Sequence, residues 1–196
     1  MNPELLAVLD LITMLFLDPH TFVLVALLLA AAGIDCKSHR IPNVLVFGGA
    51  MFALVLNWFL PPMPGVGAVW ALKGLLFGLA LLLPFYLLRA MGAGDVKLMG
   101  MVGAFVGFPS IFYVALAACL AGGVMAIAYA LHKRALRAAV NNVLTLFQVA
   151  ALSTSCGAKP SLALDSKDSV GKLPYGVAIA VGTVGYLVLK QLGIVW

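Results

Sequence analysis

Two aspartates in apolar surroundings are the residues of this chain best suited to chemistry. Asp95 closes the stretch Gly92-Ala93-Gly94-Asp95, which interrupts two long apolar runs, and Asp35 follows another apolar run. A carboxylate beside hydrocarbon is costly, and such residues usually have a function. Glycine at 92 and 94 permits a bent backbone and the close approach of another helix. We therefore interpret Asp35 and Asp95 as a pair that the fold brings together.

A pair of carboxylates in a poorly solvated place favours one particular chemistry. The two groups do not both ionise easily, because they repel each other and lose hydration, so the pair tends to share a proton. The ionised member can take a proton from water while the protonated member donates to a peptide carbonyl oxygen. This chemistry needs no metal, no other cofactor and no covalent intermediate. The acid and base roles stay unassigned, because the titration belongs to the pair.

The composition is that of a membrane protein. Hydrophobic residues make up 64% of the 196 residues, and charged residues only 10%. A soluble chain of this length could not bury so much apolar surface. The length suits one bundle without a sizeable soluble domain, so we expect residues 1–196 to form a single integral membrane domain.

Six apolar stretches predict an all-α bundle of about six transmembrane helices. Each must cross roughly 30 Å of hydrocarbon, which takes about 20 residues. Pro42 suits the first turn of the second helix, and Pro109 ends or kinks the fourth. The expected spans are 15–34, 44–60, 66–88, 96–108, 110–131 and 173–194.

The basic residues predict the orientation of this bundle. Ten of the twelve Lys and Arg lie in the segments 37–40, 89–97 and 133–172, after the first, third and fifth spans. Basic loops face the cytoplasm, so the loop 132–172 is expected there as a connector, with both termini outside. Asp35 and Asp95 then share the cytoplasmic side and the same depth. The positive charge is thus a topology signal, and the partners expected from it are membrane lipids rather than nucleic acid.

The same residues also have structural interpretations. An Asp just inside the end of a membrane helix is often an interfacial or capping residue, and Asp35 alone fits either role, whereas the flanking glycines favour a functional Asp95. Lys97 is expected as a positively charged anchor, and Cys119 as a buried thiol. The His and Cys residues have no metal-ligand spacing, so no metal site is expected. Gly74/Gly78 and Gly103/Gly107 fit close helix packing.

The motifs around the aspartates resemble those of a known family. Gly92-Ala93-Gly94-Asp95, continued by Val96-Lys97-Leu98-Met99, is similar to the GxGDxKL motif of type IV prepilin peptidases, which are GxGD membrane aspartic proteases. Asp35, followed after five residues by Ile41-Pro42-Asn43, resembles that family's first catalytic Asp and its IPN element. Leu173-Pro174-Tyr175-Gly176 resembles the start of its last span. Order, spacing and six spans agree over nearly the whole chain.

The resemblance implies a multi-pass aspartic endopeptidase of the bacterial inner membrane, with its active site at the cytoplasmic face. Such enzymes cut the short basic leader from prepilins, after a glycine and before the hydrophobic N-terminal helix of the pilin. Pseudopilins are candidates for further substrates. Asp35 and Asp95 carry over as catalytic residues, and Gly92 and Gly94 as glycines that shape the site. Further motif residues carry over at Lys97, Pro42 and Asn43, and more loosely at Pro174.

The chain resembles the short form of the family that is associated with Flp/Tad-type pili. Larger bifunctional members have a cytoplasmic insertion with two cysteine pairs and also N-methylate the new pilin end. Here only residues 36–40 separate Asp35 from Ile41-Pro42-Asn43, and the three cysteines form no CxxC pair. The resemblance therefore implies peptidase activity without methyl transfer.

Other classes of function remain as alternatives. A small ion- or proton-coupled transporter would use the two aspartates as ion ligands, but such sites usually lie near the bilayer midplane between inverted repeats. A membrane scaffold without enzymatic activity, or a GxGD protease with other membrane substrates, fits the same composition. The sequence does not indicate an oligomeric state.

Overall fold

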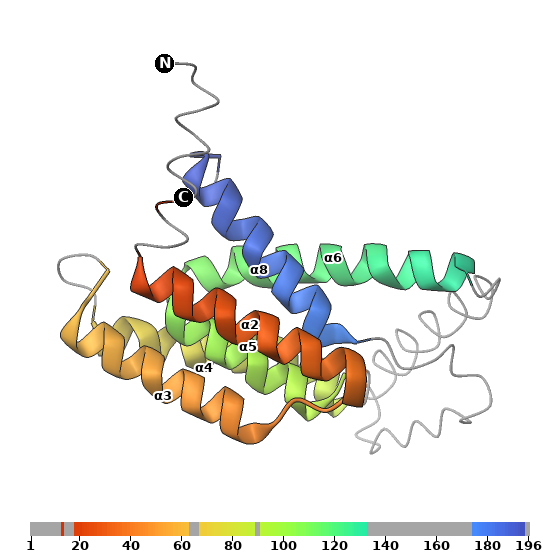
Figure 1. Ribbon diagram of the computed structural model, residues 1–196, viewed down its shortest axis with the longest axis horizontal. Helices are drawn as coiled ribbons and strands as arrows, with labels where there is room; N and C mark the ends of the chain where they lie inside the picture. Colours follow the sequence, from red (N-terminus) through yellow and green to blue (C-terminus); the bar gives the residue numbers. More distant parts are fainter. Residues whose placement is uncertain (1–12, 14–17, 63–66, 89–90, 133–173, 195–196) are drawn as a thin grey trace, which may run out of the picture.

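The computed structural model describes residues 13, 18–62, 67–88, 91–132 and 174–194, which contain six helices and no strand (Figure 1). The predicted all-α fold is confirmed. The helices are α2 (Pro19–Ser38), α3 (Asn43–Phe59), α4 (Ala68–Leu87), α5 (Ala93–Val106), α6 (Ser110–His132) and α8 (Tyr175–Gln191). Nearly all of the expected loop 132–172 lies outside the described residues.

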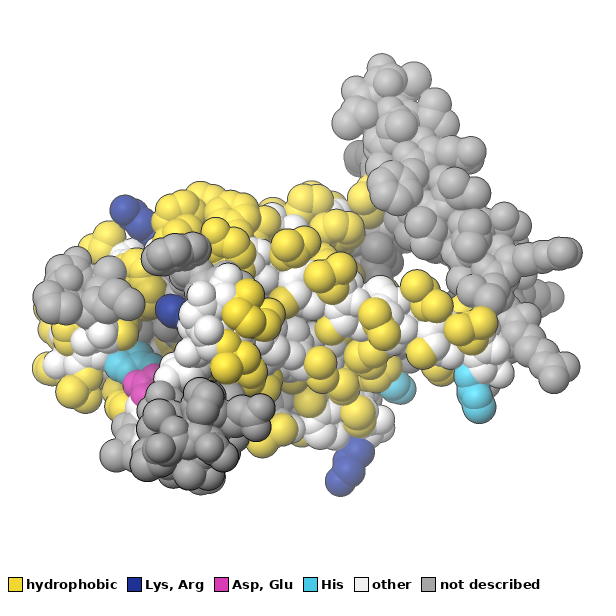
Figure 2. All heavy atoms as spheres, turned by 90° about the horizontal axis from the view of Figure 1, so that it is seen from above, with side chains coloured by type: hydrophobic (Ala, Val, Ile, Leu, Met, Phe, Trp, Pro, Cys, Tyr) yellow, Lys and Arg dark blue, Asp and Glu magenta, His cyan; other side chains and the backbone are white. Residues whose placement is uncertain are grey.

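The surface of the bundle is that of a protein surrounded by lipid. By length and composition α2, α4 and α6 can each cross a membrane, and α3 and α8 are shorter apolar helices. Large apolar side chains remain exposed on these helices, among them Trp58 at 71% and Val124 at 67%. Figure 2 shows apolar side chains spread over much of one face, with few charged groups between them. A surface this apolar is unusual in water and suits hydrocarbon.

Helix α2, the first of the described helices, begins and ends later than expected. The Asp18 carboxylate caps it by accepting the backbone N–H groups of His20 at 3.3 Å and Thr21 at 3.2 Å, and Pro19 occupies the first turn. The helix then continues to Ser38, so the expected bounds 15–34 were wrong at both ends. A capping carboxylate followed by proline is a strong start signal. As a result Asp35 lies inside the last turn of α2.

Two other boundaries differ from the expectation in ways that affect the site. Pro42 was expected in the first turn of α3, but it precedes the helix as its N-cap residue with an extended backbone. α5 begins at Ala93 rather than at residue 96, so Asp95 lies in its first turn. It ends at Val106, and Pro109 lies between it and α6.

Helix α5 is the centre of the bundle. Eleven of its fourteen residues are buried, and it contacts each of the other five described helices. Figure 1 shows it enclosed between α2, α3 and α4, with α8 crossing near α2. Because α5 carries Asp95 in its first turn, the packing around this helix determines where that carboxylate lies.

Glycines bring α4 and α5 into backbone contact, as their spacing predicted. A Cβ at Gly74 would overlap the carbonyl oxygen of Gly103, and a Cβ at Gly103 would overlap that of Gly74. A Cβ at Gly78 would lie 2.5 Å from the carbonyl oxygen of Met99. The two helices therefore pack at a distance that only glycine permits.

The prediction that Cys119 is buried was wrong. Its thiol is exposed on α6, beside the helix face that buries Val114, Ala115 and Ala118. An apolar run in a membrane helix does not indicate which face is buried, because the lipid-facing and core-facing sides are both apolar.

The α4–α5 contact predicts opposite outcomes for two Gly→Ala substitutions. Gly74→Ala forces the two backbones apart, and overpacking of this kind costs about 1–3 kcal/mol. Gly48→Ala on α3 meets no atom within 4 Å and gains helix propensity of about 1 kcal/mol. Thermal unfolding in detergent should show a lower midpoint for Gly74→Ala and an equal or higher one for Gly48→Ala. Equal midpoints for Gly74→Ala and the wild type would contradict the packing described here.

Candidate active site

Asp35 and Asp95 lie at the same end of the bundle. Asp35 is in the last turn of α2 and Asp95 in the first turn of α5. Both side chains are buried, with exposed fractions of 5% and 9%. They are close enough for their charges to interact. The structure thus brings together the two carboxylates that the sequence analysis singled out, although 59 residues separate them in the chain.

Backbone groups at the start of α5 hold Asp95 and shape the space around it. The N–H of Gly92 donates to Oδ2 of Asp95 at 3.2 Å. A Cβ at Gly92 would lie 3.2 Å from that same oxygen. A Cβ at Gly94 would lie 3.3 Å from Cβ of Ile41, in the connection between α2 and α3. Both motif glycines therefore stand where a larger residue would crowd the carboxylate or the neighbouring connection.

Asp35 is held from the far end of the sequence. The N–H of Gly176 donates to Oδ2 of Asp35 at 2.8 Å. Gly176 is in the first turn of α8, where backbone N–H groups have no partner within the helix and the helix dipole favours a negative charge. A Cβ at Gly176 would lie 2.8 Å from the same Oδ2. Glycine therefore allows the carboxylate to reach this backbone donor.

The sequence analysis named Pro174 in this segment and missed the contacts of its neighbours. Pro174 is the N-cap residue of α8, and its carbonyl oxygen accepts the N–H of Val177 at 3.1 Å. Tyr175 lies close enough to Asp95 for an electrostatic interaction. The similarity of Leu173-Pro174-Tyr175-Gly176 to a family element was the signal that pointed here, but only the fold shows that Gly176 binds Asp35.

The remaining motif residues join α5 to α3 beside the carboxylates. Nζ of Lys97 donates to Oδ1 of Asn43 at 2.9 Å and lies 5.3 Å from the ring centroid of Phe47. Pro42 is the N-cap residue of α3, directly before Asn43. The Lys97–Asn43 hydrogen bond therefore links the first turn of α3 to the first turns of α5.

The polar groups around the site are the two carboxylates and the backbone N–H groups that bind them. Within the described ranges, no three His, Cys, Asp or Glu side chains cluster in a way that could hold a metal ion. Two buried carboxylates that repel each other favour a state with one shared proton. Such a pair has one group ready to accept a proton and one ready to donate, which is the requirement for acid–base hydrolysis of an amide.

The fold and the site define a class: a helical membrane protein with a buried pair of carboxylates at one end of the bundle. A comparison with family models then identifies the family. Residues 22–127 match Peptidase_A24, the type IV leader peptidase family. The match covers more than half of the chain and both aspartates, so the chain belongs to this family. The predicted family is confirmed, and with it a peptidase that acts on prepilin leaders in general.

The other comparisons add no relative. Neither the comparison with curated proteins nor the comparison with solved structures gave a match. The matched range ends before α8, so the contact of Gly176 with Asp35 adds a component of the site from outside it.

The contact between Gly176 and Asp35 yields a prediction with a matched control. Gly176→Ala places a methyl group against the carboxylate and displaces it, and a misplacement of about 1 Å can cost about 10²-fold in rate. Gly185→Ala on the same helix meets no atom within 4 Å. Cleavage of a prepilin should fall by about 10²-fold for Gly176→Ala and stay near the wild-type rate for Gly185→Ala. Full activity of a folded Gly176→Ala variant would show that this hydrogen bond does not position Asp35.

Proposed function

We propose that this protein is an aspartic endopeptidase that removes the leader from Flp/Tad-type prepilins at the cytoplasmic face of the inner membrane. The observation that carries the proposal is that Asp35 and Asp95 are both buried at the same end of the bundle. Each carboxylate accepts a hydrogen bond from a backbone N–H at the start of a helix. Pseudopilins are candidates for further substrates of the same site.

The two carboxylates act as a unit in the proposed hydrolysis. The ionised member takes a proton from a water molecule as the water oxygen attacks the scissile carbonyl carbon. The protonated member donates its proton to the carbonyl oxygen, which yields a neutral tetrahedral intermediate. When the C–N bond breaks, the leaving nitrogen takes up a proton from the pair. One carboxylate of the pair then takes a proton from a hydroxyl of the intermediate, which becomes the new carboxyl group of the product. The pair ends with one shared proton, as it began.

The charges near the site support a cytoplasmic location. Lys37 and Arg40 lie two and five residues after Asp35, and both are exposed. Lys97 lies two residues beyond Asp95, so basic residues gather at the end of the bundle that carries the carboxylates. Basic residues beside membrane spans mark the cytoplasmic side. A site at this depth meets the junction between a soluble leader and a membrane helix without drawing that junction into hydrocarbon.

The short connection between α2 and α3 supports the form without methyl transfer. α2 ends at Ser38, His39 follows in a left-handed conformation with φ of 48°, and α3 begins at Asn43. Four residues thus connect the helices at the position where larger members of the family carry an insertion. We propose that the protein cleaves prepilins and leaves the new N-terminus unmethylated.

The transporter alternative predicts a different arrangement of the acids. Ion sites of that class usually lie near the bilayer midplane, between the halves of broken helices. Here both carboxylates lie at helix ends on one side of the bundle. No described feature favours transport, and we do not propose it.

Neutral substitutions of the carboxylates test the proposal. Asp35→Asn and Asp95→Asn preserve side-chain size and remove the acid–base function, so each should lower the cleavage rate by about 10²–10⁴-fold. Asp18→Asn is the matched control, because Asp18 caps the opposite end of α2 and asparagine caps helices equally well. Leader loss is measured by mass spectrometry with a Flp-type prepilin. Wild-type rates in either Asp35→Asn or Asp95→Asn would refute the two-carboxylate mechanism.

A second experiment tests the absence of methyl transfer. The purified protein is incubated with prepilin and radiolabelled S-adenosylmethionine, and leader loss and label on the mature pilin are measured together. We expect complete cleavage with no label above that of the Asp95→Asn variant. Label that appears on the pilin in step with cleavage would contradict the proposed short, monofunctional form.

A further inference from the structure

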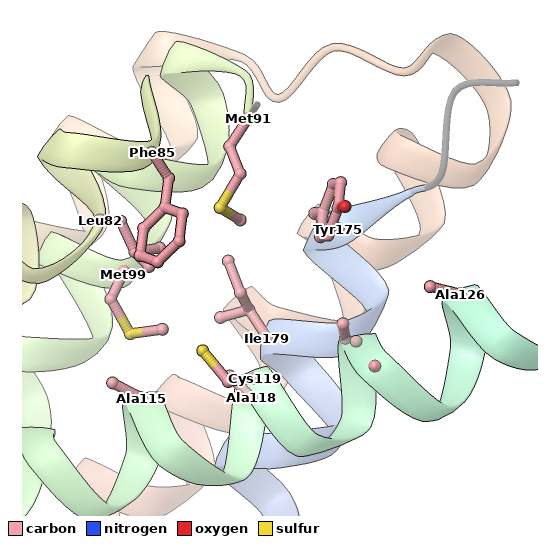
Figure 3. A pocket seen from close by; sticks show the side chains of 13 residues that line it. Leu82, Phe85, Met91, Met99, Ala115, Ala118, Cys119, Ala126, Tyr175 and Ile179 are labelled. Carbon is pink, nitrogen blue, oxygen red and sulfur yellow. The ribbon is translucent and has the colours of Figure 1, made fainter. Parts of the chain in front are cut away.

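An apolar cavity of about 240 Å³ lies between α4, α5, α6 and α8. Its walls include Phe85 on α4, Met99 on α5, Cys119 on α6 and Ile179 on α8. Figure 3 shows side chains from these helices turned toward the same space, with the sulfur atoms of Met91, Met99 and Cys119 at its edge. The exposed Cys119 thiol therefore gives chemical access to the cavity.

The cavity lies beside the residues that hold the two carboxylates of the candidate active site. Tyr175 lines the cavity and is the first residue of α8. The next residue, Gly176, donates to Asp35. Met91 also lines the cavity and directly precedes Gly92, whose N–H holds Asp95. One wall of the cavity is thus formed by immediate neighbours of the groups that hold both carboxylates.

The cavity reaches deeper into the bundle than the carboxylates. Met99 is one helical turn beyond Asp95 on α5, and Ile179 is about one turn beyond Gly176 on α8, so both lie farther from the bundle end than the carboxylates. A peptide bound with its scissile bond at the carboxylates would reach the cavity with the residues on the membrane side of that bond. Residues at that depth are apolar in any substrate that enters the membrane.

The chemistry of the walls suits a bulky apolar side chain of variable shape. A cavity of about 150 Å³ lined by apolar residues holds a benzene molecule, so this larger one accommodates a phenylalanine, leucine or methionine side chain. Methionine is flexible and polarizable and occurs often on surfaces that accept several apolar partners. Met91 and Met99, opposite Tyr175, provide such a surface.

We propose that this cavity is the subsite for an apolar side chain of the substrate on the membrane side of the scissile bond. The inference rests on the proposed function, because that function identifies the substrate as a peptide cleaved at Asp35 and Asp95. The cavity then sets the register of cleavage: the bond that reaches the carboxylates is the one whose neighbouring apolar residue fills the pocket. A lipid acyl chain is the competing occupant, and the experiments below distinguish the two.

A disulfide trap tests binding independently of catalysis. Cys119 is kept as the only cysteine in an Asp95→Asn protein that also carries Cys36→Ser and Cys156→Ser. Prepilins with one cysteine at each of the first eight positions after the scissile bond, or at each of four leader positions, are oxidised with it in membranes. We expect a disulfide at one or two of the first positions after the bond. The control protein carries Cys119→Ser and Gly48→Cys, which moves the thiol to the outer face of α3.

The cross-link pattern decides the inference separately from the mechanism. Equal cross-linking at all positions, cross-linking at leader positions, or cross-linking no greater than in the Gly48→Cys control would overturn the subsite. Cleavage of the substrate in the Asp95→Asn background would instead refute the catalytic pair, while the pattern of disulfides would still report on the cavity.

A substitution that fills the cavity provides the second test. Gly123 lines the cavity, and a Cβ there meets no atom within 4 Å, so Gly123→Leu fills space without a backbone clash. We expect kcat/KM for a prepilin with a bulky apolar residue at the trapped position to fall by about 10–200-fold. The loss should be mostly in KM, and alanine at that position of the substrate should restore most of it. Gly185→Leu, which also projects into open space, should leave both substrates unaffected.

Comparing the loss of kcat/KM for the two substrates shows whether a substrate side chain or a lipid acyl chain occupies the cavity. If an acyl chain fills the cavity, Gly123→Leu slows both substrates by the same factor, or neither of them. Either result would overturn the proposed subsite. If Gly123→Leu lowers the yield of folded protein, the disulfide trap still tests whether the substrate occupies the cavity.

Discussion

The approach of two carboxylates in an apolar bundle is the constraint on which the rest of the structure depends. Asp35 and Asp95 are both buried and repel each other when ionised, so the fold must compensate locally. It does so with backbone groups: the N–H of Gly92 at the start of α5 holds one carboxylate, and the N–H of Gly176 at the start of α8 holds the other. Helix starts supply unpaired donors and a favourable dipole. They therefore stabilise negative charge without a positively charged side chain as partner.

This solution explains why glycines occupy so much of the site and of the central packing. Gly92 and Gly176 each leave space that a methyl group would take from a carboxylate oxygen. Farther along α5, Gly103 lies against Gly74 of α4 in backbone contact, which fixes the helix that carries Asp95. The hydrogen bond from Lys97 to Asn43 ties the same end of α5 to α3. The position of one carboxylate thus depends on contacts along the whole length of its helix.

The sequence predicted the family, the all-α fold and the two aspartates that come together, because these depend on local composition and on short motifs. It placed helix ends less well: the Asp18 cap and the continuation of α2 to Ser38 were missed, since apolar runs do not mark where a cap forms. It could not show that Gly176 binds Asp35, because the two partners are 141 positions apart in the chain and only the packing of α8 against α2 brings them together. Cys119 was assigned to the core for a related reason, since in a membrane helix both faces are apolar.

The central claim is that Asp35 and Asp95 act as one unit, and a double-substitution cycle tests it most directly. Cleavage rates of a prepilin would be measured for Asp35→Asn, Asp95→Asn and the variant with both substitutions, all in matched membranes. Residues that share one proton and one step lose their common function when either is changed, so effects of such residues are strongly non-additive. The account predicts that the double variant is no slower than the slower single variant. Losses that multiply in the double variant would show two independent contributions and would contradict the pair.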